Sequence, residues 1–383
     1  MTVTFPKGFI AAGVNAGIKT GSAKDVSLVV NLGPLKNAAA RFTSNRVKAA
    51  PVLWSEQAVQ DGRIDAVILN SGGANACTGS EGFLDTHRTA EFVAELLHCS
   101  ATDIAVCSTG LIGVRLPLDR LLDGAKVAHG LLSVEGGHAA AVAIMTTDTV
   151  PKTAQIESGG VRVAGMAKGA GMLAPALATM LVVITTDAIA SPELLDTVLG
   201  EVAEVTFNRI DSDGCTSTND TVLLLASGAS GITVGEANLR EMLFSVCQDL
   251  TRQLISDAEG VSKEVAIHVI NAATELDAVE VGRACARNNL LKCALHGEDP
   301  NWGRVLAAVG TTSAVFDPNQ IDVAINDVTL CRDGSIGDDR NLVDLSARAI
   351  NILIDLKAGQ SRATIWTNDL TAEYVHENSA YSS

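Results

Sequence analysis

The strongest constraint on the fold of this chain is a glycine-punctuated loop that runs into a continuous apolar segment, at residues 168–184. The first half, Lys168-Gly-Ala-Gly-Met-Leu-Ala-Pro175, has the composition of a loop, and the second half has the length of a buried strand. Thr179 stands where the two halves meet. Threonine has a high strand propensity, so an ordinary structural interpretation of this residue stays open.

A second interpretation makes Thr179 a nucleophile. Its hydroxyl could attack the carbonyl carbon of Ala178, break the chain by an acyl shift, and leave a new α-amino group beside itself. That amine would act as the general base, because α-amino groups titrate at about 7.7–8.0, close to the pH at which a base works best. A threonine paired with its own amine is one way to activate a weak nucleophile without histidine.

The length and composition of the chain indicate a large apolar core. The chain has 383 residues, of which 47% are hydrophobic and 3% aromatic, so small aliphatic side chains supply most of the apolar mass. This length predicts two domains or one large α/β unit. Packing of small residues favours a layered α/β architecture.

The charge of the chain excludes several classes of partner. Lys and Arg total 28 against 44 Asp and Glu, a formal net charge of −16. Nucleic acid and anionic membrane surfaces attract a positive field, so we expect neither as a partner. The N-terminus lacks a charged segment followed by an apolar one, and no apolar stretch is long enough to span a bilayer. We therefore expect a soluble, cytoplasmic protein.

The sequence offers no pattern for a metal or a nucleotide cofactor. Eight cysteines and seven histidines are scattered without zinc-binding spacing. The glycines at 165–171 lack the third glycine of a dinucleotide fingerprint, and there is no Walker A loop or GxSxG elbow. The acidic loop at 211–221 lacks the glutamate that a calcium loop needs at its twelfth position. We expect neither a metal nor a resident cofactor.

Hydrophobic periodicity predicts the regular elements between the polar loops. We expect strands at 26–32, 50–54, 64–69, 104–107, 222–226 and 265–269, short strands after residue 321, and helices at 85–97, 192–205, 239–254 and 275–295. Ser191 is the expected N-cap of the second helix, with Pro192 in its first turn. Asn238 begins a capping-box pattern before the third.

Two polar loops follow expected buried strands and suit the binding of a developing negative charge. The first, residues 70–79, is rich in glycine and asparagine, and the second contains Thr109-Gly110. A threonine hydroxyl and a backbone N–H side by side are the two donors that an oxyanion hole requires. Ordinary turns would have the same composition, so both interpretations stand at this point.

The polar loops together favour acyl transfer. The loops at 70–79, 108–113, 168–179, 257–263 and 296–304 carry hydroxyls, amides, one lysine and a few carboxylates. Lys168 and Glu259 could bind the opposite charges of a small zwitterion. This set suits acyl transfer to or from such a molecule.

Six motifs in the same order strongly resemble the ornithine acetyltransferase family of arginine biosynthesis, the glutamate N-acetyltransferases called ArgJ. They lie at residues 70–79, 108–113, 144–149, 168–181, 257–263 and 299–304, and the resemblance covers essentially the whole chain. It implies an N-terminal-nucleophile-like layered α/β sandwich, made as a precursor that cleaves itself between Ala178 and Thr179. The products would be an α chain of residues 1–178 and a β chain of residues 179–383, assembled as two copies of each.

The resemblance also implies the reaction and its residues. Thr179 would take acetyl from N-acetylornithine, release ornithine and pass the acetyl group to glutamate in a ping-pong cycle. The oxyanion hole would be formed by Thr109 and Gly110, and the substrate-binding residues would be Lys168, Thr179, Glu259, Asn378, Ser383 and one of Thr146 and Thr147. Many relatives end in threonine where this chain ends in serine, and the hydroxyl and the terminal carboxylate are both kept.

Three alternatives remain open from the sequence. Acetyl-CoA would be a second acetyl donor if the enzyme is bifunctional, and no motif decides this. The same fold could serve an aminopeptidase, which would hydrolyse small amino-acid amides. A non-catalytic binder of small molecules could also use the same loops.

Overall fold

The computed structural model describes residues 2–172 and 180–380, which form two compact units. Unit 1 takes the described residues up to Asn208 together with Cys215–Asp257, and unit 2 takes Arg209–Gly214 together with residues 258–380. Neither boundary between the units falls near residue 178. The division into chains 1–178 and 179–383 stays a prediction.

Unit 1 contains two sheets, each formed by strands from distant parts of the chain. The first has the order β1-β2-β4-β5 and comprises β1 (Phe9–Val14), β2 (Val26–Asn31), β4 (Ala66–Asn70) and β5 (Ile104–Ser108). The second has the order β3-β9-β8-β7-β6 and comprises β3 (Asn37–Phe42), β9 (Thr221–Ala226), β8 (Leu181–Thr186), β7 (Val161–Lys168) and β6 (Lys152–Ser158). The pairs β4–β5 and β8–β9 are parallel and the others are antiparallel.

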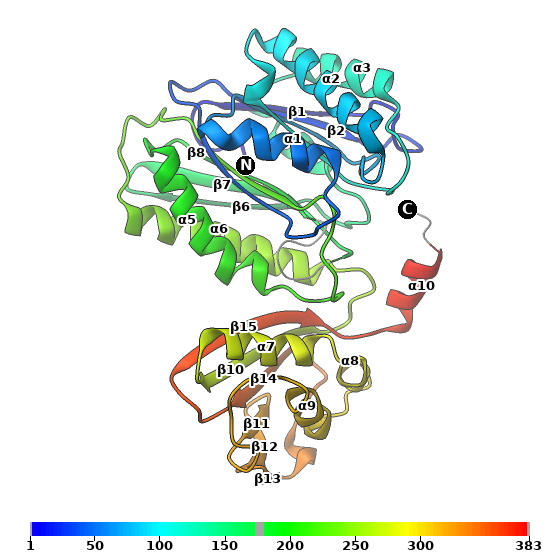
Figure 1. Cartoon of the computed structure of the whole chain (residues 1–383), viewed down its shortest axis with the longest axis vertical. Helices are drawn as coiled ribbons and strands as arrows, with labels where there is room; N and C mark the ends of the chain where they lie inside the picture. Colours follow the sequence, from blue (N-terminus) through cyan, green and yellow to red (C-terminus); the bar gives the residue numbers. More distant parts are fainter. Residues whose placement is uncertain (1, 173–179, 381–383) are drawn as a thin grey trace. The chain divides into compact units, whose positions relative to one another are not determined.

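The two sheets of unit 1 face each other, and helices cover their outer faces (Figure 1). Helices α2 (Gly79–Leu97) and α3 (Leu118–Gly130) cover the first sheet, and α5 (Pro192–Val205) and α6 (Glu236–Ser256) cover the second. Helix α1 (Ala50–Ala58) lies at the edge of β5, and α4 (Gly137–Ala143) packs against β1 and β2 with Ala140 and Ala141 in the core between the sheets. The 3-10 turns of unit 1 lie at Val59–Asp61, Ala101–Asp103 and Phe207–Arg209. Residues from both sheets, including Leu69, Cys107, Leu181 and Leu223, form the core between them. Unit 1 is therefore a layered α/β sandwich, as predicted.

Strands β2, β4, β5, β8 and β9 are buried along their whole length. Each has a layer on both faces, so a continuous apolar run replaces the alternation of a half-exposed strand. This burial confirms the strand predicted after Thr179. On the outer face of the second sheet, a Cβ added at Gly165 would lie 3.0 Å from Leu250 and 3.3 Å from Val246, both in α6, so a small residue permits this close approach.

Residues 50–54 were predicted as a strand, and this prediction is wrong: they begin helix α1. A five-residue apolar run does not distinguish a strand from a buried helix, and Pro51 in the first turn is the signal that favours the helix. The helix lies along the free edge of β5. There the Ser55 hydroxyl accepts from Val106 N at 2.9 Å and donates to Val106 O at 2.8 Å.

The predicted helix starts were right in one case and wrong in another. Helix α5 begins and ends as expected, and the Ser191 hydroxyl accepts from Leu194 N. Helix α6 begins at Glu236, after the N-cap Gly235, so Asn238 lies inside the first turn and caps nothing. The helix therefore begins three residues before Leu239, the first buried residue of its apolar stripe.

Unit 2 is built on one six-stranded sheet of order β13-β12-β11-β14-β10-β15. Its strands are β10 (Glu264–Ala272), β11 (Asp322–Ile325), β12 (Val328–Arg332), β13 (Ser335–Ile336), β14 (Ala349–Asp355) and β15 (Ser361–Asn368), and a 3-10 turn lies at Arg340–Leu342. Its helices are α7 (Glu275–Ala286), α8 (Asn289–His296), α9 (Trp302–Val309) and α10 (Ala372–Ala380). The predicted strand at 265–269 is confirmed within β10.

The single helix predicted at 275–295 is two helices, α7 and α8. The break comes at Asn288, whose side chain accepts from Leu291 N and caps a new helix. Asparagine favours such caps because its short side chain competes with the backbone for hydrogen bonds. An apolar stripe that continues across the break hid this signal in the sequence.

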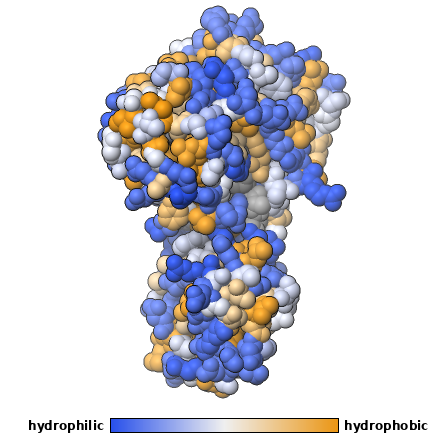
Figure 2. Space-filling view, turned by 60° about the vertical axis from the view of Figure 1, so that its left-hand side comes forward, coloured by the Kyte–Doolittle hydropathy of each residue, from blue (hydrophilic) through white to orange (hydrophobic). Residues whose placement is uncertain are grey.

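The surface mixes apolar and polar side chains, as Figure 2 shows for one face. Over residues 2–172 and 180–380, the structure contains no helix long and apolar enough to cross a membrane.

Candidate active site

Thr109 and Gly110 follow the last residue of β5 and lie against the loop at 70–79. Thr109 N donates to Asn70 O at 3.0 Å, and Gly73 N donates to Thr109 O at 3.0 Å. The Asn70 side chain donates to the Ser108 hydroxyl at 2.6 Å. The two glycine-containing loops predicted from the sequence are therefore bound to each other, and each fixes the backbone of the other.

Gly110 has a backbone conformation that other residues rarely adopt. Its φ is +128°, and a Cβ added there would lie 2.8 Å from the backbone nitrogen of Gly73. Within the described ranges, no acceptor takes the Gly110 N–H, whereas the N–H of Thr109 is already used. An oxyanion hole at this turn would therefore combine the backbone N–H of Gly110 with the side-chain hydroxyl of Thr109.

Lys168 is the last residue of β7 and is 1% exposed. Its ammonium donates to the Thr109 hydroxyl oxygen at 3.2 Å. A lysine ammonium has donors and no acceptor, so the hydroxyl must accept this bond. The hydroxyl hydrogen of Thr109 is thereby left to point to another acceptor, which is the orientation that an oxyanion hole needs.

Asp148 is a buried carboxylate that holds two predicted site segments. It accepts from Gly169 N at 2.7 Å and from Thr146 N at 2.9 Å. It also accepts from the Lys152 ammonium at 2.6 Å. Burial by itself would raise its pKa, but the positive charges of Lys168 and Lys152 outweigh burial and lower the pKa to about 2. Asp148 is therefore the negative centre of this part of the site.

Lys152 extends this network to the end of helix α6. Its side chain is fully buried and donates to Asp257 at 2.5 Å as well as to Asp148. Two carboxylates compensate one buried ammonium, an arrangement that offsets the cost of removing the charges from water. The network therefore joins Thr146 and Gly169 to Asp257, the last described residue of unit 1.

We expect the Asp148→Asn variant to lose about 2 kcal/mol of stability at pH 7, from a pKa lowered from 3.8 to about 2. A lowered pKa contributes stability above the unfolded-state value of about 3.9, and this contribution is lost as the pH falls toward 2. Urea unfolding at several pH values should show the difference between the two proteins shrinking below pH 4.

The control is Asp119→Asn, the same substitution at an exposed position. Substitutions on the surface alter stability by about 0.5 kcal/mol or less. A constant difference between Asp148→Asn and the unchanged protein from pH 7 to pH 3 would contradict the assigned role of the charge.

The start of β8 lies beside Lys168, because Lys168 pairs with Leu181 across the β7–β8 ladder. Met180 is buried, its N–H donates to Asp220 Oδ1 at 3.1 Å, and its carbonyl accepts from Thr221 N at 3.0 Å. Met180 directly follows Thr179 in the chain. Three predicted residues lie outside the described ranges: Ala178, Thr179 and Ser383. Their predicted roles stay predictions.

The remaining predicted binding residues divide between the units. Thr146 and Thr147 are half-buried in unit 1, and the bonds of Thr146 to Asp148 do not decide which threonine binds substrate. Glu259 and Asn378 belong to unit 2, where Asn378 is exposed on α10.

Within unit 2, the loop that carries Glu259 lies against the start of helix α10. Thr371 donates to Gly260 O at 2.6 Å, and a Cβ added at Gly260 would lie 2.2 Å from Tyr374 N. Burial and the nearby carboxylates of Glu259 and Glu373 raise the pKa of Glu377. The structure thus places Glu259 next to the helix that carries the predicted residue Asn378.

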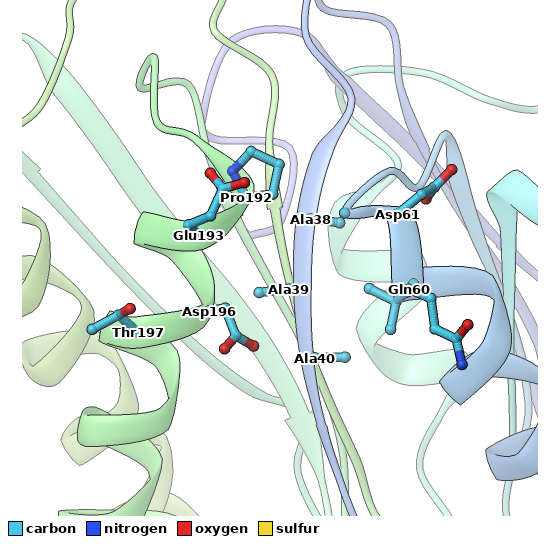
Figure 3. Close-up of a pocket in the computed structure, with 11 residues that line it drawn as sticks. Ala38, Ala39, Ala40, Gln60, Asp61, Pro192, Glu193, Asp196 and Thr197 are labelled. Carbon is cyan, nitrogen blue, oxygen red and sulfur yellow. The ribbon is translucent and has the colours of Figure 1, made fainter.

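A separate cavity of about 380 Å³ lies between β3, the turn at Val59–Asp61 and the start of α5 (Figure 3). Its walls include alanines of β3 and the carboxylates of Asp61, Glu193 and Asp196. None of the predicted site residues lines it.

In the part of the chain that the structure describes, no group of three or more His, Cys, Asp and Glu side chains is arranged to hold a metal ion.

Sequence reasoning missed four buried polar residues of unit 1: Asp148, Lys152, Asn219 and Asp220. The first lies inside a recognised motif, but the motif directs attention to the neighbouring hydroxyls. Asn219 and Asp220 lie in the acidic loop that was considered only for calcium. The available signal was that the loop runs directly into the apolar strand β9, so its last polar residues had to enter the core.

The layered sandwich, with the predicted nucleophile directly before a buried central strand, defines an α/β protein of the N-terminal-nucleophile type. The model of the ArgJ family matches residues 10–383. The chain therefore belongs to the ArgJ family.

Relatives from several organisms agree with this assignment. Proteins named arginine biosynthesis bifunctional protein ArgJ from Streptomyces coelicolor and Thermobifida fusca are 62% and 61% identical to the chain, each over the full length of both. A solved ornithine acetyltransferase from Mycobacterium tuberculosis, complexed with ornithine, is 56% identical, covers 45% of this chain and 94% of its own, and has a TM-score of 0.45.

Proposed function

We propose that the chain is a self-processing acetyltransferase of arginine biosynthesis, which moves acetyl from N2-acetyl-L-ornithine to L-glutamate through an acetyl-Thr179 intermediate. The observation that carries the proposal is the bond from Lys168 to the Thr109 hydroxyl, beside the N–H of Gly110, which has no acceptor among the described residues. The names of the full-length relatives, arginine biosynthesis bifunctional protein ArgJ, support the pathway.

Self-cleavage comes first in this proposal. The Thr179 hydroxyl attacks the carbonyl carbon of Ala178, and the C–N bond between the two residues breaks as the nitrogen takes a proton. The ester that results is hydrolysed by water, which leaves a carboxylate on Ala178 and a free α-amine on Thr179. That amine is the base for the next reaction.

Acetyl transfer then uses the same hydroxyl twice. The amine of Thr179 takes the hydroxyl proton while the oxygen attacks the acetyl carbonyl of N-acetylornithine, and Thr109 and Gly110 stabilise the oxyanion. The C–N bond breaks, the departing ornithine amine receives the proton, and acetyl remains as an ester on Thr179. The amine of glutamate attacks this ester, which gives N-acetylglutamate and restores the threonine.

The wider properties of the enzyme belong to the same proposal. It uses no metal and no resident cofactor, because the proton transfers and charge stabilisation fall to Thr179, Thr109 and Gly110. Acetyl-CoA serves as a second acetyl donor to glutamate, which the word bifunctional in the names of the relatives supports. Two α and two β chains assemble, in the cytoplasm.

The test combines electrophoresis with an assay of each donor. Purified protein should separate into two fragments under denaturing conditions, and Edman sequencing of the larger should read Thr-Met-Leu-Val-Val. Ornithine release beyond one equivalent per active site should require glutamate, and acetyl-CoA should also acetylate glutamate. A single, intact and fully active chain would overturn the proposal. Hydrolysis of amino-acid amides without acetyl transfer would favour the aminopeptidase instead.

A further inference from the structure

Two consecutive buried residues, Asn219 and Asp220, contact the backbone beside both parts of the candidate active site. They directly precede β9, which lies next to β8 in the second sheet. Asn219 contacts the end of β5 in the first sheet, and Asp220 contacts the residue before β8 in the second. A two-residue segment therefore contacts both sheets, beside Thr109 in the first and at Met180 in the second.

Asn219 binds the backbone next to the predicted oxyanion hole. Its side-chain amide donates to Ser108 O at 2.8 Å and to Ala74 O at 2.6 Å. The Ser108 carbonyl belongs to the peptide group that joins Ser108 to Thr109. Asn219 thus fixes the peptide directly attached to Thr109 and ties it to the loop that contacts Gly110.

Asp220 binds the backbone at Met180, the residue after the predicted nucleophile. Its Oδ1 accepts from Met180 N at 3.1 Å, and that nitrogen belongs to the peptide group that joins Thr179 to Met180. Asp220 is fully buried, and its Oδ2 has no hydrogen-bond partner among the described residues. A buried, ionised carboxylate with a free oxygen would be costly, so the group is expected to be neutral.

The charges around Asp220 agree with a neutral acid. Burial raises its pKa well above the ordinary value, although the Met180 N–H and the positive charge of Lys168 on β7 oppose this change. The Thr43 side chain and the Ser217 backbone also lower the pKa of Asp220, but burial outweighs all of these groups. A neutral acid can be replaced by an amide of the same shape.

The segment that carries the pair is itself held rigidly. Thr43 N donates to Asp220 O at 3.0 Å, and the Thr43 hydroxyl donates to Ser217 O at 2.6 Å. Ala49 N donates to Thr218 O at 2.9 Å. The backbone on both sides of Asn219 is therefore fixed by hydrogen bonds, which is what a positioning element needs.

We propose that Asn219 and Asp220 are paired positioning residues, which set the peptide beside Thr179 against the peptide beside Thr109. This inference rests on the proposed function, because it assigns the two threonines to nucleophile and oxyanion hole. Neither residue takes part in bond making. A misplacement of about 1 Å at reacting groups can cost about 100-fold in rate, so loss of either residue should act on kcat.

The exchange of acid and amide at the two positions provides a sharp test. Asp220→Asn keeps the acceptor for Met180 N–H, so kcat should stay within about threefold. Asn219→Asp replaces the donor with an oxygen that faces two carbonyl oxygens, so kcat should fall about 100-fold, as in Asn219→Ala. KM for N-acetylornithine should change by less than about threefold in each. Rates are counted per molecule with Thr179 at its N-terminus, measured by Edman yield.

Asp187 supplies the matched control for loss of a buried carboxylate. It is fully buried in unit 1 and accepts backbone N–H groups from Arg162 at 2.8 Å and Lys7 at 3.1 Å. Asp187→Ala should lower the melting temperature and leave kcat per cleaved molecule within about twofold. Asp220→Ala should lower kcat about 100-fold.

The outcomes separate this inference from the proposed function. Failure of the unchanged protein to cleave or to transfer acetyl would contradict the proposed function. With an active unchanged protein, the inference is overturned if Asn219→Asp keeps its kcat, if Asp220→Asn loses it, or if Asp187→Ala loses as much as Asp220→Ala. If Asp220→Ala does not fold, the comparison of Asp220→Asn with Asn219→Asp decides.

Discussion

The Thr179→Ala variant is expected to remain a single uncleaved chain and to lose acetyl transfer completely. Alanine has no hydroxyl to attack the carbonyl of Ala178 or an acetyl group, so both reactions lose their nucleophile. Denaturing electrophoresis should show one band of 39.6 kDa. Ornithine release should fall to the background rate, by at least about 10⁴-fold.

Thr179→Ser is the matched control, because serine keeps the hydroxyl and removes one methyl group. It should cleave and transfer acetyl, with rates reduced by about tenfold or less, since the change affects only packing beside the nucleophile. Normal activity in Thr179→Ala would contradict the nucleophile assignment. Inactive Thr179→Ser would show instead that the methyl group is essential.

The Gly110→Ala variant is expected to lose about 100- to 1,000-fold in kcat, as is typical when one oxyanion donor is displaced. The new methyl group would lie 2.8 Å from Gly73 N, so one of the two loops must move. The N–H of Gly110 would move with it. Steady-state kinetics should show the loss in kcat. The rate of self-cleavage between Ala178 and Thr179 should also fall.

Gly113→Ala separates steric contact from backbone strain. Gly113 lies in the same loop with φ of +84°, but a Cβ added there meets nothing within 4 Å. This control should lose about 1–3 kcal/mol of stability from its positive φ and keep its kcat within a few fold. Equal losses of kcat in both variants would mean that strain in the loop, and not the position of Gly110, limits the reaction.

The sequence predicted the layered architecture and most strands of unit 1, because strands buried on both faces are continuous apolar runs. It predicted helix α5 almost to the residue, since Ser191 and Pro192 mark its start chemically. The prediction of a strand at 50–54 was wrong because this segment has few chemical marks of its structure. A short apolar run has no period of its own, and Pro51 was the single local signal of a helix.

The sequence predicted those candidate-site residues that lie in recognisable motifs. It did not predict the contacts that form only when distant segments pack together. The bond between Lys168 and Thr109 joins residues 59 positions apart, and no local pattern predicts which hydroxyl a buried lysine will reach. Asp148, Asn219 and Asp220 act through backbone groups of other segments. Such contacts follow from the pairing of the two sheets, which the sequence does not specify residue by residue.

The Ser55 hydroxyl on the edge of β5 has a consequence for the behaviour of the newly made chain. An open strand edge offers free N–H and C=O groups to any passing strand, and this is a common start of aggregation. Ser55 occupies both groups of Val106, so another strand would have to displace helix α1 before it could pair there. Helix α1 thereby protects the chain from pairing with another chain along β5, the strand that leads to Thr109 and Gly110.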